Sequence, residues 1–263
     1  MSDSHLLVDR ADAVATITFN RPDKKNAMTG PMWDALLAAL TELGADRAVR
    51  VVVLTGSDDS FCAGQDLLDP VNALRFNGVG GALTTMRMMS DVAMALHELP
   101  QPTIAAVNGV AAGAGANLAL GCDLIVAAQT ARFSQISTKR GLTLDLGGSW
   151  LLPRLVGLPK AKELAFLGDM VSAADAERLG LINRVVADEE LTHAVRALAE
   201  QLAAGPPLAM SAMKRQLNDS MQQSLAQALE AEAVAQAMLF STDDVREAVT
   251  AFIEKRPPHF TGQ

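Results

Sequence analysis

Two glycine-rich segments of this chain have the residue types and spacing to hold a developing negative charge. They are Phe61-Cys-Ala-Gly-Gln-Asp-Leu67 and Val107-Asn-Gly-Val-Ala-Ala-Gly-Ala-Gly-Ala-Asn-Leu118. Because glycine and alanine have little or no side chain, such turns let the main chain approach a ligand closely. Two backbone N–H groups that converge from separate turns can hold one carbonyl oxygen while it becomes an oxyanion. The two segments therefore indicate chemistry through an enolate.

Both segments follow short apolar runs that are rich in β-branched residues and are typical of strands. The four predicted strands occupy residues 13–19, 51–55, 103–107 and 123–127. Apolar residues at helical spacing predict helices at 29–43 and 84–99, and the second turn continues into a small-residue helix that reaches about Gly121. Repeated strand, loop and helix units predict an α/β fold.

The pattern changes after about Pro159, where almost every signal is helical. Ser172 and Asp175 have the spacing of a capping box, and Gly180 is a predicted helix C-cap. The alanine-rich stretch 207–240 predicts two helices, and another is expected at 242–254 before two prolines end it. We therefore predict a core domain over residues 1–200 and a C-terminal helical region over 201–263. Because helices with wide apolar faces often dock on a neighbouring subunit, the second region is expected to serve oligomerisation.

Composition excludes several classes of protein. With 263 residues and 49% apolar content the chain can bury one substantial core. A net charge of −8 argues against non-specific nucleic-acid binding, so any phosphate on a ligand must meet a local cluster of basic side chains. Cys62 and Cys122 suggest neither a disulfide framework nor a metal site. Residues 1–10 lack an apolar signal core, and no run of about 18 apolar residues occurs, so we expect a cytoplasmic protein without a membrane span.

The two turns form part of a longer resemblance. Together with Asn20-Arg-Pro-Asp-Lys-Lys-Asn-Ala-Met28 and Pro153-Arg-Leu-Val-Gly157 they resemble the crotonase, or enoyl-CoA hydratase/isomerase, superfamily over nearly the whole chain. Four segments look most like the ring-epoxide isomerases of bacterial phenylacetate degradation: 61–67, 107–120, 141–154 and 251–262. The resemblance implies a ββα spiral core with a C-terminal helical region, and a homotrimer or a dimer of trimers.

The resemblance also implies a ligand and the groups that bind it. An acyl-CoA thioester is expected to be held by two backbone amides, which the motifs assign to Gln65 and Ala114. Ala114 stands where glycine is usual, which costs nothing if its φ is negative. CoA would be part of the substrate, so no separate cofactor and no metal are expected.

The acidic residues discriminate between reactions. Hydratases of the superfamily use two glutamates, and at the matching positions this chain has Asn117 and Ser137, which cannot exchange a proton near neutral pH. Asp145, in contrast, lies where the ring-epoxide and dienoyl-CoA isomerases carry a catalytic aspartate. One carboxylate is enough to remove a proton from one carbon and return it to another. The resemblance therefore favours isomerisation, although Leu144 replaces the proline that precedes this aspartate in the epoxide isomerases.

Asp145 has two other interpretations. It could cap a helix predicted at 146–155 by accepting a backbone N–H. Dehalogenases of the same superfamily place a nucleophilic aspartate here, but they also surround the ring with aromatic side chains, and Ser137 stands where one of them would be. Asn117 could bind substrate or water, or could equally be structural.

CoA contacts are expected around the segment 21–25, as in relatives. Lys24 or Lys25, with Lys255 or Arg256 from another subunit, could neutralise phosphate charge, although a solvated charge is the more common role for any single lysine. The other residues that the motifs place beside CoA are Ala27, Ala63, Asp66, Leu67 and Gly113.

Apolar and aromatic side chains give weaker signals. Four methionines could line the acyl group or pack in the core: Met86, Met88, Met89 and Met94. Trp150 is interpreted as a core residue, and His97, without a paired carboxylate, as a surface histidine.

Three functional classes follow. The favoured one is an acyl-CoA isomerase that shifts a double bond or opens a ring epoxide, with Asp145 as base and acid. The alternatives are an enoyl-CoA hydratase or acyl-CoA hydrolase, in which Asp145 activates water, and a non-catalytic protein that binds CoA esters.

Overall fold

A six-stranded sheet runs through the centre of the computed structural model, which describes residues 5–263. Its strands, in spatial order, are β1 (Leu6–Ala11), β2 (Val14–Phe19), β3 (Val51–Gly56), β5 (Thr103–Val107), β7 (Leu124–Ala128) and β10 (Arg184–Val186). The β1–β2 pair is antiparallel and all the other pairs are parallel. In β3 five of the six residues are buried, as expected for a strand covered on both faces.

A second sheet of four short strands lies below the first. Its strands, in order, are β4 (Ser60–Cys62), β6 (Val110–Ala112), β8 (Arg132–Ser134) and β9 (Val171–Ser172). Each of β3, β5 and β7 in the large sheet is followed at once by a strand of the small one and then by a helix. This repeated strand–strand–helix unit is the predicted ββα spiral, and it brings the three crossover loops to one side of the core.

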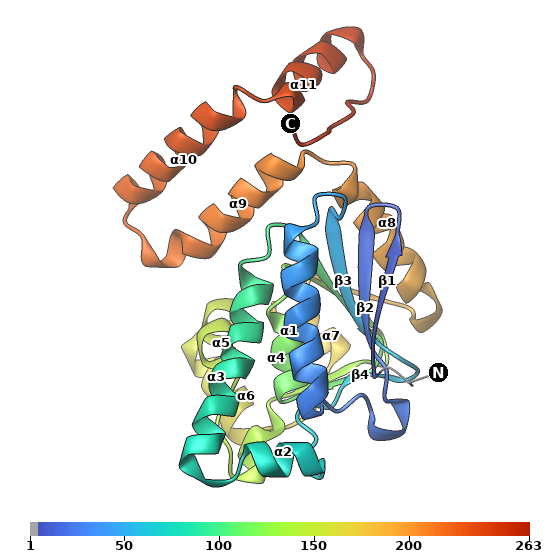
Figure 1. The fold of residues 1–263 in the computed structure, drawn as a ribbon, viewed down its shortest axis with the longest axis vertical. Coiled ribbons are helices and arrows are strands. Elements are labelled where there is room, and N and C mark those ends of the chain that lie inside the picture. Colours follow the sequence, from blue (N-terminus) through green and yellow to red (C-terminus); the bar gives the residue numbers. More distant parts are fainter. Residues whose placement is uncertain (1–4) are drawn as a thin grey trace.

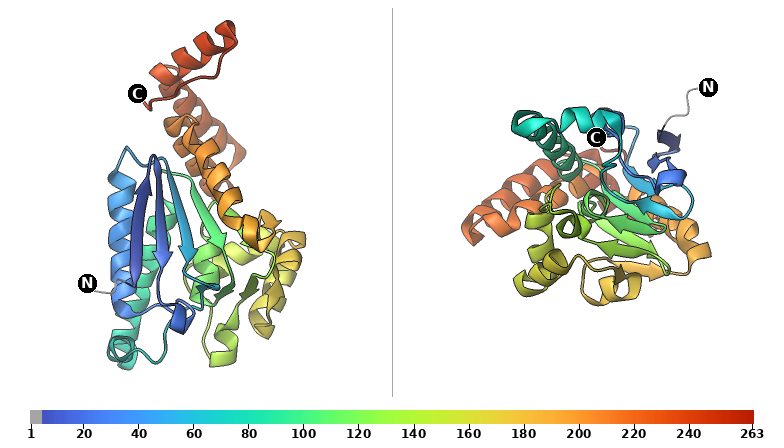
Figure 2. Two further views of the ribbon diagram at one scale, coloured as in Figure 1. Left: turned by 90° about the vertical axis from the view of Figure 1, so that its right-hand side faces the viewer. Right: turned by 90° about the horizontal axis from the view of Figure 1, so that it is seen from below.

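Helices cover both faces of the large sheet (Figure 1, Figure 2). On one side lie α1 (Gly30–Ala45) and α3 (Gly78–His97), which pack on each other, and on the other side α8 (Leu191–Ala203) packs on β3, β5 and β7. Helix α8 buries Leu191, Val195 and Ala199 along one stripe. The short helices around the lower sheet are α2 (Pro70–Arg75), α4 (Ala114–Leu120), α5 (Gly148–Val156), α6 (Leu158–Leu167), α7 (Ala173–Arg178) and the 3-10 turns η1 (Pro22–Lys24), η2 (Ile136–Arg140) and η3 (Asp188–Glu190).

The C-terminal helices extend away from this core as an arm (Figure 1). They are α9 (Pro207–Asp219), α10 (Leu225–Leu239) and α11 (Asp243–Glu254), with the 3-10 turn η4 (Ser220–Gln222) between the first two. Ser224 begins α10 with a complete capping box and Thr242 caps α11. Large apolar side chains on the arm are left exposed, among them Leu217, Met238 and Phe252.

Most of the predicted elements are confirmed, and four predictions need correction. Helix α3 begins at Gly78 and not at 84, and α5 spans Gly148–Val156 and not 146–155. The region after Pro159 also contains two short strands, β9 and β10. Ser172 caps α7 as predicted, and the helix C-cap is Leu179, with Gly180 following in a left-handed conformation. Among residues 5–263, no helix has the length and apolar content needed to cross a bilayer.

Candidate active site

The first glycine-rich turn presents the N–H group of Gln65 without a partner. Its neighbours are bonded, since Met28 N donates to Gly64 O at 2.8 Å and Asp66 N donates to Met28 O at 2.9 Å. Across residues 5–263, nothing accepts a hydrogen bond from Gln65 N. The two flanking peptides therefore hold this amide in place and leave its N–H available.

The second turn presents a matching group at the start of α4. Gly113 has φ 53° and ψ −124°, which only glycine adopts readily, and its N–H donates to Ser134 O at 2.8 Å. Ala114 then begins the helix with a negative φ, as its replacement of glycine requires. Its N–H is one of the four that an α-helix leaves unpaired, and none of the described residues accepts it.

The two turns pack directly against each other. A β-carbon on Gly115 would lie 2.0 Å from Cys62 O, and one on Gly64 would lie 2.7 Å from Ala112 O and 3.4 Å from Ala114 N. Any larger residue would push the main chains apart. The glycines thus set the separation of the two turns, and with it the separation of the two free N–H groups.

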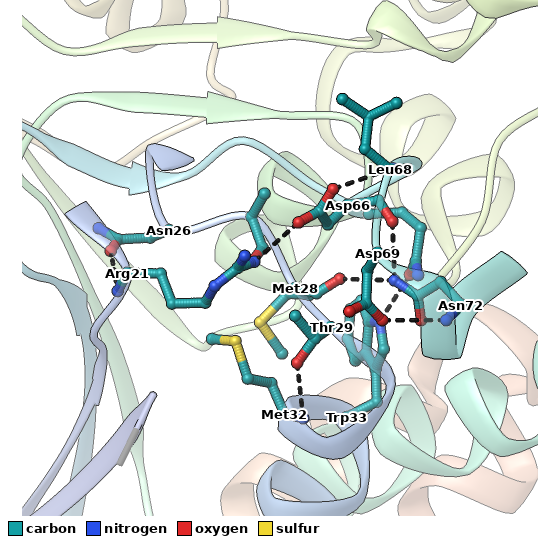
Figure 3. Close-up of polar contacts among 12 residues, drawn as sticks. Arg21, Asn26, Met28, Thr29, Met32, Trp33, Asp66, Leu68, Asp69 and Asn72 are labelled. Atoms are coloured by element: carbon teal, nitrogen blue, oxygen red, sulfur yellow. Dashed lines mark hydrogen bonds and ion pairs between the residues drawn. The ribbon is translucent and has the colours of Figure 1, made fainter. Parts of the chain in front are cut away.

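Charged and polar side chains brace the first turn (Figure 3). The Asp66 carboxylate accepts from Arg21 Nη1 at 2.9 Å and from Leu68 N at 3.0 Å, and the Arg21–Asp66 pair is only 13% exposed on each side chain. Asn72 on α2 donates its Nδ2–H to Asp66 O at 2.8 Å and to Met28 O at 3.2 Å. Asp66 therefore orders the loop beside the free N–H of Gln65.

The side chain of Gln65 is anchored on the opposite side. Trp33, which is fully buried in α1, donates its indole N–H to Gln65 Oε1 at 2.6 Å. The Nε2 end of the same amide is buried and has no partner among the described residues. Trp33 is therefore the single anchor of this side chain.

Asp145 lies at the start of a tight turn. Asp145 O accepts from Gly148 N at 2.8 Å, and the two residues between them, Leu146 and Gly147, have φ of 44° and 77°. Positive φ at both central positions is typical of a type I′ turn and is unusual for a leucine. Because of this turn, α5 begins only at Gly148, and the Asp145 side chain points toward α4.

The Asp145 carboxylate does not cap a helix. The N-cap of α5 is Gly147, and no side chain caps that helix. Instead, Asp145 Oδ1 accepts from Asn117 Nδ2 at 3.2 Å, while the same Nδ2 also donates to Asp145 O at 3.0 Å. Desolvation raises the pKa of Asp145, and the Asn117 hydrogen bond opposes part of this rise. The capping interpretation is therefore wrong, and Asp145 has the electrostatic setting of an acid/base group.

Asn117 joins this carboxylate to the second turn. It lies one helical turn after Ala114 in α4, is 1% exposed, and accepts from Gln135 Nε2 at 2.9 Å. Ser137, at the other position matched to a hydratase glutamate, is buried beside Gly113. An amide and a hydroxyl therefore occupy the two positions where a two-acid mechanism needs carboxylates.

A cavity of about 260 Å³ reaches this site at Asn117, while Asp145, Gln65 and Ala114 are not among the residues that line it. Asn117 and Gly147 lie on its wall with His97, Trp150 and Met94. His97 meets the Trp150 ring edge-on with 5.4 Å between centroids, and Arg154 lies 3.9 Å above the same ring. His97 is half-buried and Trp150 faces a cavity, so both depart from the surface and core roles predicted for them. A larger cavity of about 940 Å³ lies between the large sheet, α8 and the C-terminal tail, and its lining includes neither Gln65, Ala114 nor Asp145.

Comparison with known proteins decides the family. The model of the enoyl-CoA hydratase/isomerase family matches residues 9–263. The chain belongs to the enoyl-CoA hydratase/isomerase family. A protein named "Probable enoyl-CoA hydratase" from Rhodobacter capsulatus is 41% identical over 263 residues, 100% of both chains. The 1,2-epoxyphenylacetyl-CoA isomerase of Escherichia coli is 40% identical over 254 residues, 95% of each chain. The crystal structure of an enoyl-CoA hydratase from Bacillus anthracis has a TM-score of 0.93 at 32% identity and covers 99% of this chain and 100% of its own.

These matches confirm the crotonase resemblance and the crotonase-type fold. The relatives carry the names of both hydratases and an isomerase, so an acyl-CoA hydratase/isomerase of this family is the activity that the comparisons establish. Which of the two reactions this chain performs depends on its own residues.

The structure brings some of the predicted family-site residues together and separates others. The two turns, Ala63 to Leu67 and Gly113 to Asn117, pack against each other, and Asn117 bonds Asp145. Ala27 O accepts from Arg21 Nη1 at 2.7 Å beside Asp66. Lys24 and Lys25 are exposed in and just after η1. Lys255, in contrast, ends α11 at the far end of the arm (Figure 1). Within one protomer it cannot share a ligand with Lys24, so its predicted role requires another subunit.

Three residues of the site were not predicted. Trp33 and Gln135 bond to Gln65 and Asn117 across 32 and 18 residues of sequence, and Asn72 lies on α2, outside both glycine-rich segments. A buried tryptophan or glutamine within an apolar run signals a polar partner, but not which partner. Of the four methionines, Met94 lines the cavity, Met89 is buried in the core, and Met86 and Met88 pack against the core.

Proposed function

We propose that this protein is an acyl-CoA isomerase that shifts a double bond or opens a ring epoxide of a CoA thioester. The observation that carries the proposal is the pairing of one carboxylate with two free main-chain donors. Asp145 is held against Asn117, one helical turn after the unpartnered N–H of Ala114, and the turn that carries the unpartnered N–H of Gln65 packs against that of Ala114. In this proposal CoA is part of the substrate, and neither a separate cofactor nor a metal takes part.

The proposed reaction moves one proton. The Asp145 carboxylate removes a proton from a carbon beside the unsaturated system, and the electron pair of the broken C–H bond passes through that system to the thioester oxygen. The N–H groups of Gln65 and Ala114 hydrogen-bond the resulting enolate oxygen. Asp145 then returns its proton to another carbon, the thioester C=O is restored, and the enzyme regains its starting state.

The surroundings of Asp145 support this role. A carboxylate that must both accept and return a proton works best with a pKa raised toward neutrality, and burial raises the pKa of Asp145. Asn117 and Ser137 have no proton to exchange near neutral pH, so a second acid for hydration is missing from the described site. The cavity beside Asn117 provides apolar and aromatic walls for a compact acyl group.

The deciding experiment compares Asp145→Asn with the matched control Asp91→Asn, an exposed aspartate on α3. With an unsaturated acyl-CoA that the wild type converts, we expect kcat of Asp145→Asn to fall by about 10²–10⁴-fold while CoA-ester affinity stays within a few-fold. Asp91→Asn should behave as wild type. Retained turnover in Asp145→Asn would refute the proposal.

A second candidate is hydration, because a relative named as a probable enoyl-CoA hydratase is 41% identical over the full length. In that reaction Asp145 would activate water alone. Turnover in ¹⁸O-labelled water separates the two reactions, since isomerisation incorporates no label and hydration or thioester hydrolysis must. A protein that binds CoA esters without converting any would instead be a non-catalytic binder.

We further propose that the protein works in the cytoplasm as a homotrimer or dimer of trimers. The exposed apolar side chains of the arm support assembly through α9 to α11, since large exposed apolar surfaces mark interaction sites. Lys24 and Lys25, with Lys255 from a neighbouring subunit, are proposed to bind the CoA phosphates. Sedimentation analysis measures the number of subunits directly.

A further inference from the structure

Gln135 lies at the start of a helical turn, but its side chain bonds elsewhere. It directly follows β8 and is the N-cap residue of η2, and its side chain makes no capping hydrogen bond. It is 5% exposed and points instead to α4, where Nε2 donates to Asn117 Oδ1 at 2.9 Å. A buried polar side chain that forgoes a local bond for one 18 residues away in sequence indicates a specific role for that bond.

Asp145 fixes the direction in which hydrogen bonds are donated along the chain Gln135–Asn117–Asp145. Both atoms that Asp145 offers to Asn117, its main-chain O and its ionised carboxylate Oδ1, can only accept hydrogen bonds. Asn117 must therefore turn its Nδ2–H toward Asp145 and its Oδ1 away, so the group beyond it must donate. Gln135 supplies that donor, which leaves its own Oε1 as the far end of the chain. That oxygen is indeed buried without a partner among the described residues.

We propose that Gln135 is a positioning residue: its Nε2–H locks the Asn117 amide in the one orientation that donates to the Asp145 carboxylate. If the Asn117 amide turned over, its Nδ2 would oppose the Gln135 donor and its Oδ1 would oppose the Asp145 carboxylate. Both contacts are repulsive, so the intact chain has a single stable arrangement. Without Gln135 one of the two penalties disappears, and the amide is free to leave Asp145 or to bond elsewhere.

The locked amide governs the affinity of Asp145 for a proton. The Asn117 donor stabilises the ionised carboxylate against the desolvation that favours its protonated form. The titratable and charged groups on the surrounding elements are Cys62 in β4, Arg87, Asp91 and His97 on α3, Lys139 and Arg140 on η2, and Arg154 on α5. Burial raises the pKa of the Cys62 thiol to about 12, so it stays neutral. Within residues 5–263, Asn117 is the only other residue whose side chain donates to this carboxylate.

The test replaces Gln135 by Met, which keeps the length of the side chain and removes its amide. The matched control is Gln101→Met, because Gln101, like Gln135, is buried, donates through Nε2 and leaves its Oε1 without a partner. Its acceptor is a main-chain oxygen, Leu43 O, at 2.9 Å. The readout is the pKa of Asp145 in the ligand-free protein, measured by NMR of ¹³C-labelled aspartate carboxyl groups and assigned with Asp145→Asn.

We expect Gln135→Met to raise the Asp145 pKa by about one unit, since a hydrogen bond to a charged group is lost, and Gln101→Met to leave it unchanged. The acidic limb of the kcat–pH profile should move to higher pH by the same amount. An unchanged Asp145 pKa in a folded Gln135→Met protein would overturn the proposal.

A second variant keeps the proposal testable if Gln135→Met does not fold. A β-carbon at Gly148 would lie 2.6 Å from Asn117 Nδ2 and 2.7 Å from its Oδ1, so Gly148→Ala displaces the same amide without touching Gln135. It should also raise the Asp145 pKa, and a value equal to wild type would count against the locked amide.

The inference rests on the proposed isomerase only through the role given to Asp145, and the two fail separately. Turnover retained in Asp145→Asn would refute the catalytic proposal while leaving the NMR result valid. An inactive Asp145→Asn combined with an unmoved pKa in Gln135→Met would refute the positioning role alone.

Discussion

Replacing Trp33 by Phe tests whether the first glycine turn acts as a rigid donor. The substitution keeps an aromatic ring in the core and removes the indole N–H that bonds Gln65 Oε1 at 2.6 Å. Because Gln65 Nε2 already has no partner in the described chain, both polar atoms of the amide would then be unsatisfied. A buried acceptor left without its donor costs about 1–3 kcal/mol, and the smaller ring adds part of the cost of a cavity. We expect the free energy of unfolding to fall by about 2–4 kcal/mol.

The change in kcat tests the role of Trp33 more directly than the change in stability does. With the Trp33 bond lost, only the flanking main-chain hydrogen bonds at Gly64 and Asp66 hold the turn, so the Gln65 N–H would be held less rigidly toward the enolate oxygen. Complete removal of one such donor in other enzymes lowers kcat by about 10²–10³-fold, so a loosened donor is expected to lower it by about tenfold, or about 1.4 kcal/mol. KM for the CoA ester should change by less than about threefold, because the loss concerns charge that develops only in the transition state.

Two further proteins separate this effect from general destabilisation. Leu36→Ala, at a fully buried position of the same helix α1, should cost about 2–5 kcal/mol of stability with no change in kcat. Gln65→Met removes the acceptor, so the double variant Trp33→Phe/Gln65→Met should lose little more kcat than either single variant. Steady-state kinetics with urea unfolding measure both quantities. A wild-type kcat in a destabilised Trp33→Phe protein would refute the reasoning.

Three more predictions follow from the same geometry. Burial raises the pKa of Asp145 in the folded state, so the ionised carboxylate destabilises the fold as pH rises above its unfolded pKa. Asp145→Asn should therefore raise Tm at pH 7 and give no gain below about pH 4, and equal gains at both pH values would contradict this. Gly115→Ala would place a β-carbon 2.0 Å from Cys62 O and should lower the unfolding free energy by at least about 3 kcal/mol, which chemical denaturation would show. Lys24→Met/Lys25→Met should raise KM for CoA esters more than for pantetheine thioesters, and equal effects on both would exclude a role with phosphates.

The sequence predicts the long elements of this fold better than its short ones. Helix α11 carries a clear apolar period, and α10 and α11 both begin at explicit caps, Ser224 and Thr242, which are local signals. Strands β4, β6, β8 and β9 have two or three residues each, too few for a period of two to be distinguished from a loop. The start of α5 was misplaced because the left-handed φ of Leu146 belongs to a conformation that leucine rarely adopts.

The candidate site, too, could be predicted from the sequence only in part. Its two turns could be recognised because glycine is required where main chains meet, and Asp145 because a family motif surrounds it. The residues that hold these groups in place could not, since the bonds from Trp33 to Gln65 and from Gln135 to Asn117 arise only after the spiral has brought distant segments together.

The contact between Gly115 and Cys62 also limits how this enzyme can change during evolution. With no room for even a methyl group between the turns, the two donors cannot be spaced differently for a new thioester. Adaptation to other acyl groups must therefore occur elsewhere. In the segment from Leu68 to Val79 the exposed positions, such as Leu68 (92%), Leu74 (77%) and Val79 (87%), can accept substitutions, whereas the buried Asn72 must be kept because it braces the first turn. Libraries for altered substrate preference should be confined to those exposed positions and to the cavity wall around Met94.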